Sequence, residues 1–289
     1  MTDELMPAIN GAWRSQRELS AEQRLDVLNL LNRTETELGR EALDESRRRI
    51  VVHGWPAEHW LRYRDAGLAQ YAMVTGTRPA QVEMCGGGVE GDLLHDLLVE
   101  HASLDWWTRD VQGDTIASGR VIRTLQLLQV DLPVECSKVP PGSTLRNFEP
   151  GRDEASWLEQ NNAAFADHPE QGAWTPSDLD ERIHEPWFDP SGFLLLDIDG
   201  RLAASCWTKV HELHPDRFGE IYVISVHPDF QGRSLGRFMV TQGLDVLRRK
   251  GVSRAVLFVD ASNESAKSLY QSIGFNLERE DRLVHFSRR

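Results

Sequence analysis

The sequence has few cysteines, and their arrangement suggests neither a disulfide framework nor a metal site. Cys85, Cys136 and Cys206 are odd in number and scattered, without a C-x-x-C pair or the spacing of metal ligands. This pattern is typical of reduced cysteines in a cytosolic protein. We interpret each of them as a small buried side chain rather than as a nucleophile.

Long apolar runs are also missing. No stretch approaches the ~18 consecutive apolar residues that a membrane-spanning helix needs. The first seven residues, Met-Thr-Asp-Glu-Leu-Met-Pro, lack the basic region and apolar region of a secretory signal. We therefore expect a cytoplasmic protein that does not bind a membrane.

Neither half of the chain has an excess of positive charge. Residues 1–140 carry 15 basic and 22 acidic side chains, residues 141–289 carry 17 and 23, and the net charge is −13. This balance argues against a protein that binds nucleic acid or an anionic membrane. With 289 residues, of which 40% are hydrophobic, the chain is long enough for two domains with substantial cores.

The most informative segment is residues 220–275. Glu220–Val226 alternates in hydrophobicity and is rich in β-branched residues, which predicts a strand. Gln231–Arg237 then opens a helix, which Lys250 and Gly251 close with a cation and a C′ glycine. The sequence therefore predicts a strand, a glycine-bearing loop and a helix in succession.

A helix that starts in this loop would present unpaired backbone N–H groups and the positive end of its dipole, a suitable site for a phosphate group. Gly232 and Gly236 keep side chains away from a ligand, and Arg233 and Arg237 could add charge-assisted hydrogen bonds. The alternative is an ordinary strand-to-helix turn with solvated arginines, because short glycine motifs recur by chance.

The residues after this helix continue the pattern. Ala255–Val259 is a short apolar run and predicts a second strand. Asp260–Asn263 is a cluster of turn and cap residues, and Glu264–Tyr270 then predicts a second helix. Gly274 and Phe275 lead into a final strand near Arg282–Phe286.

Taken together, these features resemble the GCN5-related N-acetyltransferase (GNAT) family. In that family a loop with the pattern Gln/Arg-x-x-Gly-x-Gly/Ala binds the pyrophosphate of acetyl-CoA, and here the pattern falls on Gln231, Ser234 and Gly236. Ser234 replaces the first glycine. A serine still supplies its N–H if its backbone has negative φ, so we expect the loop to work with weaker binding. An asparagine and a tyrosine of the family fall on Asn263 and Tyr270.

The resemblance implies acetyl-CoA as the cosubstrate and no metal. It assigns cofactor contacts to the end of the central strand, to the loop and to the start of the second helix. These residues are Ile224, Ser225, Val226, Gln231, Gly232, Arg233, Ser234, Leu235, Gly236, Arg237, Asn263, Glu264, Ser265, Ala266, Lys267 and Ser268.

The predicted boundary between two domains is Ser137–Ser143, where two prolines and a glycine follow a predicted strand at Leu125–Leu132. We predict domains at residues 1–136 and 144–289 with a linker at 137–143. The second half then has the element order β-α-α-β-β-β-α-β-α-β of a GNAT domain. Its earlier elements are a strand Thr144–Phe148, a helix Asp153–Phe165, a strand Phe193–Ile198, a hairpin turn Asp197–Gly200 and a strand Leu202–Val210.

The first half follows the same order less clearly, which predicts a tandem repeat. The fold class is thus α/β (α+β), with two tandem GNAT domains, each a mixed, mostly antiparallel sheet flanked by helices. The loop Gly86–Gly91 lacks basic residues, and Glu90 and Asp92 would repel a pyrophosphate, so we expect this copy to cover substrate rather than to catalyse. Its elements are helices Ala21–Leu31 and Asp92–His101 and strands Ala69–Thr75, Gln81–Cys85, Leu104–Trp107 and Arg123–Val130.

Three stretches, Asn161–Thr175, Glu185–Pro190 and Gly219–Pro228, resemble the mycothiol acetyltransferase subfamily of actinobacteria. This resemblance implies acetylation of the cysteinyl amine of a cysteinyl-glucosaminyl-inositol (Cys-GlcN-Ins), which gives mycothiol, by direct attack without a covalent enzyme intermediate. The likeness is concentrated in the second half of the chain.

The proposed chemistry needs a base and an acid. An α-amine has a pKa near 7.7–8.0 and attacks only when neutral, so Glu220, where the family places its base, could take its proton. Tyr270 matches the family's acid and could protonate the leaving thiolate, while a strand N–H near Ile224–Val226 polarises the thioester oxygen. The alternatives are a surface glutamate for Glu220 and a packed aromatic side chain for Tyr270.

Binding of the acceptor is assigned by the same resemblance to Glu170, Lys209, Glu220 and Phe258, the last where the family often has a tyrosine, and to Asp44 of the first half. For Asp44 and its neighbour Glu45, a solvated helix face is the alternative. His168 and His184 have no metal-ligand spacing and are interpreted as surface histidines.

Two other functions stay open. The chain could acetylate another small amine or a protein N-terminus, for which an open groove would replace a closed polar cleft. It could also be a regulatory module that binds CoA without turnover. We expect a monomer with a small-molecule substrate.

Overall fold

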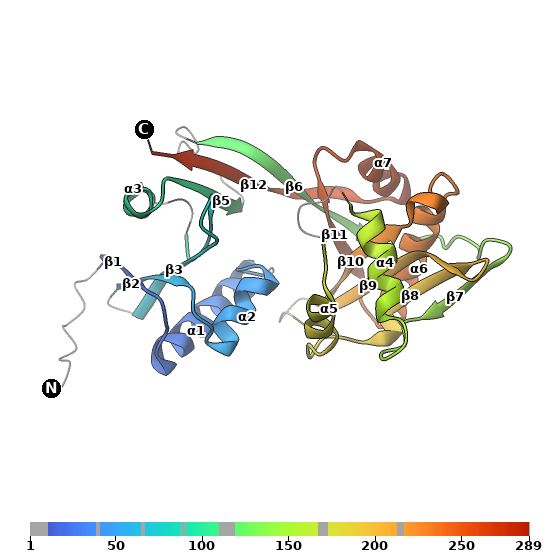
Figure 1. Ribbon diagram of the computed structural model, residues 1–289, viewed down its shortest axis with the longest axis horizontal. Helices are drawn as coiled ribbons and strands as arrows, with labels where there is room; N and C mark the ends of the chain where they lie inside the picture. Colours follow the sequence, from blue (N-terminus) through green and yellow to red (C-terminus); the bar gives the residue numbers. More distant parts are fainter. Residues whose placement is uncertain are drawn as a thin grey trace. The chain divides into compact units, whose positions relative to one another are not determined.

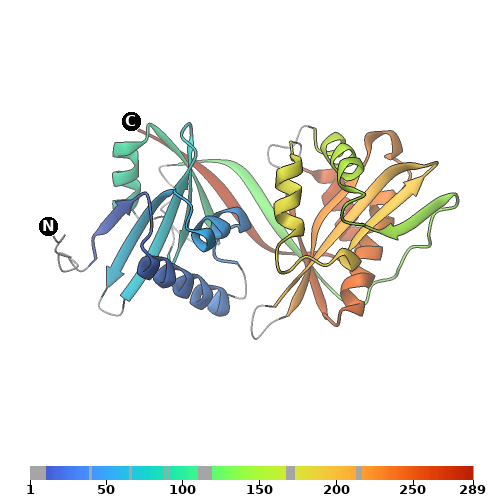
Figure 2. The same cartoon turned by 60° about the horizontal axis from the view of Figure 1, so that its bottom comes forward.

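The computed structural model describes residues 11–38, 41–64, 67–87, 89, 91–109, 119–166, 173–212 and 217–288. The chain forms two compact units, each built of β-strands with flanking helices (Figure 1, Figure 2). Unit 1 comprises residues 1–125, 213–215 and 279–289, and unit 2 comprises residues 126–212 and 216–278.

Unit 2 has the element order that the sequence predicts for a GNAT domain. Strand β10 pairs antiparallel with β9 and parallel with β11, so the sheet is mixed but mostly antiparallel, as expected. The elements are β7 (Ser143–Asn147), α4 (Glu154–Ala164), α5 (Pro176–Ile183), β8 (Phe193–Ile198), β9 (Arg201–His211), β10 (Phe218–Val226), α6 (Leu235–Arg249), β11 (Arg254–Asp260), α7 (Glu264–Ile273) and β12 (Asn276–Ser287).

Local sequence signals explain where these elements begin and end. Asp199 and Gly200 both have positive φ, 51° and 76°, as the two-residue hairpin between β8 and β9 requires. Asn263 caps α7 by accepting a hydrogen bond from the N–H of Ala266 at 3.0 Å. Gly274, with φ of 114°, ends the same helix in the left-handed region.

Alternate residues of β9 belong to two hydrophobic cores on opposite faces of the sheet. Trp207 packs on the face that carries α4 and stacks on Phe193, with ring centroids 4.4 Å apart. Cys206 belongs to the other core, which includes Phe238 and Met239 of α6. The strands that could hold a site are therefore fixed from both faces.

Unit 1 repeats the pairing pattern of unit 2, which confirms the tandem repeat. Strand β3 pairs antiparallel with β2 and β4, and β4 pairs parallel with β5. Strands β1 and β2 and helix α2 were not predicted. The elements are β1 (Trp13–Gln16), α1 (Ala21–Leu38), α2 (Glu45–His53), β2 (Glu58–Arg64), β3 (Gly67–Thr75), β4 (Ala80–Cys85), α3 (Gly91–Glu100), β5 (Ser103–Arg109) and β6 (Arg120–Asp131).

The last strands of the two repeats are exchanged. The segment 281–287 of β12 pairs antiparallel with β5 in unit 1. In unit 2, Gln129 of β6 accepts a hydrogen bond from Arg254 of β11 at 2.9 Å, and β6 is next to β11 in the strand order. The compact units therefore have other bounds than residues 1–136 and 144–289, and the linker at 137–143 stays a prediction.

The three cysteines are free thiols. Cys85 and Cys206 are buried as expected, but the expectation was wrong for Cys136, which is exposed. Cys136 lies between β6 and β7, where the backbone forms no regular element that could cover it. In the described ranges, no helix is both long and apolar enough to cross a membrane.

Candidate active site

The loop before α6 has the hydrogen-bond donors of an anion site. Among the described residues, the backbone N–H groups from Gly232 to Arg237 have no hydrogen-bond acceptor. The next N–H, that of Phe238, does have an acceptor: it donates to the carbonyl of Ser234 at 3.2 Å. These free donors coincide with the positive end of the α6 dipole, so the loop can bind a phosphate group.

Ser234 has a left-handed backbone, with φ of 59° and ψ of 17°, so the condition of a negative φ is not met. Gly232 is left-handed as well, with φ of 74°. Left-handed residues that alternate with other conformations curve the backbone into an anion-binding concavity. The turn thus demands the conformation that glycine adopts freely, and a serine there carries a penalty on the order of 1 kcal/mol.

We predict that Ser234→Gly raises the free energy of unfolding by about 0.5–1 kcal/mol, because relief of the left-handed strain exceeds the extra flexibility of glycine. Urea denaturation followed by circular dichroism measures this. Ser156→Gly in α4 is the matched control, since the same exchange inside a helix should destabilise the protein. An equal decrease in the free energy of unfolding in both variants would contradict the proposed backbone strain at Ser234.

The other residues of the loop have separate tasks. Arg237 donates to the hydroxyl and carbonyl of Ser272 at 2.7 and 3.2 Å, which joins α6 to α7. A Cβ on Gly236 would lie 3.3 Å from Leu269 of α7, so this glycine allows close helix packing. The guanidinium of Arg233 is 5.2 Å from the ring of Phe230 and is exposed. Arg233 is therefore better placed than Arg237 to reach a phosphate.

The end of β10 offers a second set of donors. Register pairs between β10 and β11 occur only at Gly219–Ala255 and Glu220–Val256. The N–H of His227 donates to Ala203 of β9 at 2.9 Å, and pairs in an antiparallel ladder alternate. The N–H groups of Ile224 and Val226 therefore point away from β9, toward the edge where β11 is no longer paired.

Ser225, in contrast, faces inward. Its hydroxyl is 2.9 Å from that of Ser205 on β9, and both hydroxyls lie within 3.1 Å of the amide oxygen of Gln160 on α4. Trp157 also donates to Ser205 at 3.0 Å. This buried network fixes β9, β10 and α4 to one another, so of the three strand residues assigned to the cofactor, Ser225 has a structural role.

Glu220 lies near the start of β10 and is largely buried. Its Oε2 is 2.6 Å from Nε2 of His211, and Lys209 is its register partner on β9. Burial raises the pKa of this carboxyl, but the hydrogen bond from His211 and the positive charges of His211 and Lys209 outweigh burial. The net pKa is lowered below 4.5, so Glu220 is a carboxylate at neutral pH.

Tyr270 lies on α7 in the core that includes Cys206 and is 6% exposed. Its ring meets that of Phe275 edge-on at 5.8 Å. Burial, and to a smaller degree the neighbouring thiol of Cys206, raise the pKa of the phenol well above 10. No hydrogen bond of its hydroxyl is found among the described residues. Tyr270 is thus a protonated donor without an internal acceptor.

Glu220 and Tyr270 belong to the same unit but do not touch. Ile221 packs in the core of Tyr270, and alternation along β10 directs Glu220 to the opposite face. The fold thus brings the carboxylate and the phenol into one unit but not into contact. The edge of β10 toward β11 is unpaired after Glu220. A ligand that lies along this edge could reach both Glu220 and Tyr270.

The start of α7 is largely occupied by its own contacts. Asn263 is the N-cap, and the ammonium of Lys267 donates to the carbonyl of Ala261 and to Glu264, both at 2.9 Å. These contacts organise the helix terminus. The helix dipole still favours an anion there, and the cofactor contacts assigned to Asn263, Glu264, Ser265, Ala266, Lys267 and Ser268 stay predictions.

The residues assigned to the acceptor have different surroundings. The ammonium of Lys209 is 4.7 Å from the ring of Trp187 and 5.7 Å from that of Tyr222. Phe258 on β11 is 45% exposed and could contact a ligand. Glu170, like His168, lies outside the described residues.

Asp44 has a clear local role in unit 1. It is the N-cap of α2, accepts a hydrogen bond from the N–H of Arg47 at 2.8 Å and forms an ion pair with its guanidinium. These contacts hold the pKa of Asp44 below its usual range despite the opposing effect of burial. Its assignment to substrate stays a prediction.

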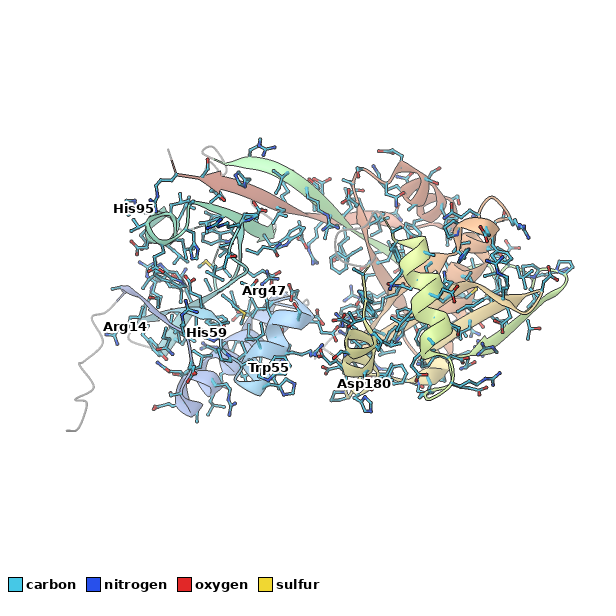
Figure 3. All side chains as sticks on the ribbon, viewed as in Figure 1. Arg14, Arg47, Trp55, His59, His95 and Asp180 are labelled. Atoms are coloured by element: carbon cyan, nitrogen blue, oxygen red, sulfur yellow. The ribbon has the colours of Figure 1, made fainter. Side chains whose placement is uncertain are left out.

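The counterpart of Glu220 in unit 1 is Gln81, since Ala80 and Gln81 pair with β5 as Gly219 and Glu220 pair with β11. The guanidinium of Arg47, which α2 carries (Figure 3), donates to Gln81 at 3.2 Å and to Thr75 at 3.1 Å. An amide thus stands where unit 2 has the carboxylate of Glu220, and an arginine donates a hydrogen bond to it. Gly88 and Glu90 of the expected loop lie outside the described residues.

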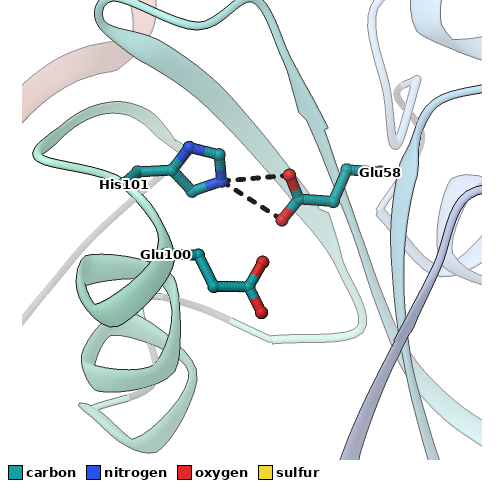
Figure 4. Close-up of side chains that lie close together, drawn as sticks. All are labelled: Glu58, Glu100 and His101. Carbon is teal, nitrogen blue, oxygen red and sulfur yellow. Dashed lines mark hydrogen bonds and ion pairs between the residues drawn. The ribbon is translucent and has the colours of Figure 1, made fainter.

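A cluster of potential metal ligands also occurs in unit 1, formed by Glu58, Glu100 and His101 (Figure 4). Nε2 of His101 is 3.0 and 3.2 Å from the two oxygens of Glu58. One of these oxygens also accepts a hydrogen bond from Trp60 at 2.7 Å. The contacts are those of a hydrogen bond between side chains that joins β2 to the end of α3.

Sequence reasoning missed His211 and Arg47. Alternation along β9 places Lys209 and His211 on one face, which was the available signal, but the register that brings Glu220 opposite them is known only from the fold. Arg47 gave no signal, because an arginine in a short helix is usually solvent-exposed.

Comparison with known families matches residues 157–275 to the Acetyltransferase (GNAT) family. Mycothiol acetyltransferase of Streptomyces griseus subsp. griseus is 35% identical over 300 residues, which cover 97% of both chains. That of Streptomyces coelicolor is 36% identical, with 94% of both chains covered. That of Thermomonospora curvata is 51% identical over 163 residues, 56% of this chain and 54% of the relative.

Solved structures support the fold. A GCN5-related N-acetyltransferase from Sphaerobacter thermophilus has a TM-score of 0.69 at 20% identity, with 95% of each chain covered. A tandem GNAT protein from the clavulanic acid biosynthesis pathway has a TM-score of 0.68 at 16% identity and covers 96% of this chain. With its fold and its near full-length relatives, the chain belongs to the mycothiol acetyltransferases, which are acyltransferases of the GNAT type.

Proposed function

We propose that this enzyme transfers an acetyl group from acetyl-CoA to the cysteinyl amine of Cys-GlcN-Ins and so forms mycothiol. The observation that carries the proposal is the run of free N–H groups from Gly232 to Arg237, which follows the strand of the largely buried carboxylate Glu220 after one short turn. The names of the full-length relatives support this choice of substrate over other amines.

In this proposal the loop amides hold the pyrophosphate of acetyl-CoA, and the N–H of Ile224 or Val226 polarises the thioester oxygen. Glu220 takes a proton from the attacking amine as the C–N bond forms. The C–S bond then breaks, and Tyr270 gives its proton to the leaving sulfur. Solvent returns a proton to Tyr270 and removes one from Glu220, so no covalent enzyme intermediate is needed.

The acceptor contacts belong to the same proposal. Lys209 and Phe258 are the candidates on β9 and β11, and Glu170 and Asp44 are assigned by resemblance alone. A sugar–inositol substrate needs polar partners, and Phe258 offers an apolar face where the family often has a hydroxyl. A monomeric state and a cytoplasmic location stay predictions from the sequence.

A product assay tests the function. The enzyme is incubated with acetyl-CoA and Cys-GlcN-Ins, free cysteine, GlcN-Ins or an N-terminal peptide, and products are labelled with a bimane or separated directly for mass spectrometry. We expect acetylation of Cys-GlcN-Ins to exceed that of the other acceptors by at least about tenfold in kcat/KM. Preference for a peptide, or thermal stabilisation by acetyl-CoA without any turnover, would contradict the proposal.

A further inference from the structure

His211 is the last residue of β9 and is buried beside Glu220. Its side chain is 7% exposed, and its Nε2 lies 2.6 Å from Oε2 of Glu220. The imidazole stacks on the ring of Phe218, with centroids 4.5 Å apart and planes at 10°. Both the position and the plane of the ring are therefore fixed by packing and not only by the hydrogen bond.

The contact uses one oxygen of the carboxylate. Among the described residues, Oε1 of Glu220 has no hydrogen-bond partner, whereas Oε2 is bound at a short distance. A carboxylate can accept hydrogen bonds at both oxygens. One oxygen is therefore anchored and the other remains available to an incoming donor.

Other charged and titratable groups surround the pair. Lys209 of β9 is opposite Glu220, and Tyr222 of β10 lies 5.7 Å from its ammonium. Arg254 of β11 places its guanidinium 4.8 Å from the ring of Phe218, on which His211 stacks. From α5, Arg182 donates to the hydroxyl of Tyr222 at 3.2 Å. All of these groups except Glu220 are cationic or neutral, which favours the ionised carboxylate.

We propose that His211 is a positioning residue of the acetyl transfer: it anchors Oε2 of Glu220, so that Oε1 faces the acceptor amine. This inference rests on the proposed function, because it needs Glu220 to be the base. A glutamate side chain has three rotatable bonds, and a fixed rotamer removes the cost of orienting it during the reaction. His211 itself turns Nε2 toward Glu220 and not toward a substrate.

The test compares His211→Phe with His211→Gln in the full-length enzyme. Phenylalanine keeps the stacking on Phe218 but removes the hydrogen bond to Oε2 of Glu220, and we expect kcat to fall about tenfold. KM for both substrates should change less than about threefold, and the acid limb of the kcat–pH profile should move to higher pH, because burial of Glu220 is then less opposed. In His211→Gln the amide can donate a hydrogen bond to Oε2. This variant should recover more than half of the loss in log kcat that His211→Phe causes.

The matched control is His184→Gln, an exposed histidine at the end of α5, which should leave kcat and the pH profile unchanged. A wild-type kcat and pH profile in His211→Phe, with Glu220→Gln inactive, would overturn the inference alone. An active Glu220→Gln would instead overturn the proposed role of the base. If His211→Phe does not fold, other variants decide. A wild-type kcat in His211→Ala would overturn the inference. So would an equal kcat in His211→Gln and in His211→Leu, which cannot donate a hydrogen bond.

Discussion

Exchange of Glu220 for glutamine is expected to lower kcat by about 10²–10³-fold at pH 7, within the usual contribution of a general base. Glutamine has the same shape and keeps a polar partner for His211, so the fold should be retained. The loop from Gly232 to Arg237 is untouched, and we expect an unchanged Kd for acetyl-CoA by isothermal titration calorimetry. Loss of both folding and acetyl-CoA binding would assign Glu220 a structural role instead.

The pH dependence gives this prediction a second readout. In the wild type the pKa of Glu220 is lowered, so its carboxylate is ionised at neutral pH and can take a proton from the bound amine, and protonation of Glu220 sets the acid limb. In Glu220→Gln only amines that are already neutral react, and their fraction grows as pH passes about 7.7–8.0. The loss should therefore be smaller at pH 9 than at pH 7. The exposed Glu149→Gln in unit 2 is the control and should behave as wild type.

Exchange of Tyr270 for phenylalanine is expected to lower kcat by about 10–10²-fold, because the leaving thiolate loses its proton donor. The effect is smaller than for Glu220, since a thiol with a pKa near 8.5 leaves readily without full protonation. The ring contact with Phe275 remains, and no internal hydrogen bond of the described residues is lost. The melting temperature should therefore stay within about 2 °C of wild type.

The alternative role of Tyr270 as a packed side chain makes the opposite prediction. Tyr270→Phe would then keep full activity, whereas Tyr270→Ala would lose stability through the cavity it creates. Because burial raises the pKa of Tyr270 well above 10, its loss of a proton should not appear in the profile below pH 10. Tyr63→Phe in unit 1, which removes a hydroxyl bonded to Asp26, is the matched control and should leave kcat unchanged.

The sequence predicted most elements of unit 2 because their signals are local. Alternation at Glu220–Val226 matches β10, and the cap residues Asn263 and Gly274 match the ends of α7. Strand β2 escaped prediction because its alternation is hidden by polar side chains, such as His59, which is buried and bonded to Tyr71 at 2.7 Å. Helix α2 is short and rich in arginine, although its capping residues follow the usual pattern.

Two features of the site depend on the fold and not on local pattern. The backbone conformation of Ser234 is imposed by the turn, and a serine in the sequence gives no sign of positive φ. The approach of His211 to Glu220 needs the register of β9 on β10 across a hairpin, which periodicity does not define. The exchange of β6 and β12 is likewise invisible, since either strand would satisfy the hydrophobic pattern of either sheet.

This exchange has a consequence for how the protein is made. The strand that completes the sheet of unit 1 lies at 281–287, so a ribosome that has released the first 136 residues has not yet supplied it. The edge of β5 in the first repeat therefore stays open until residues 281–287 have been made. The order of the strands means that unit 1 cannot be completed before the residues of unit 2 have been synthesised.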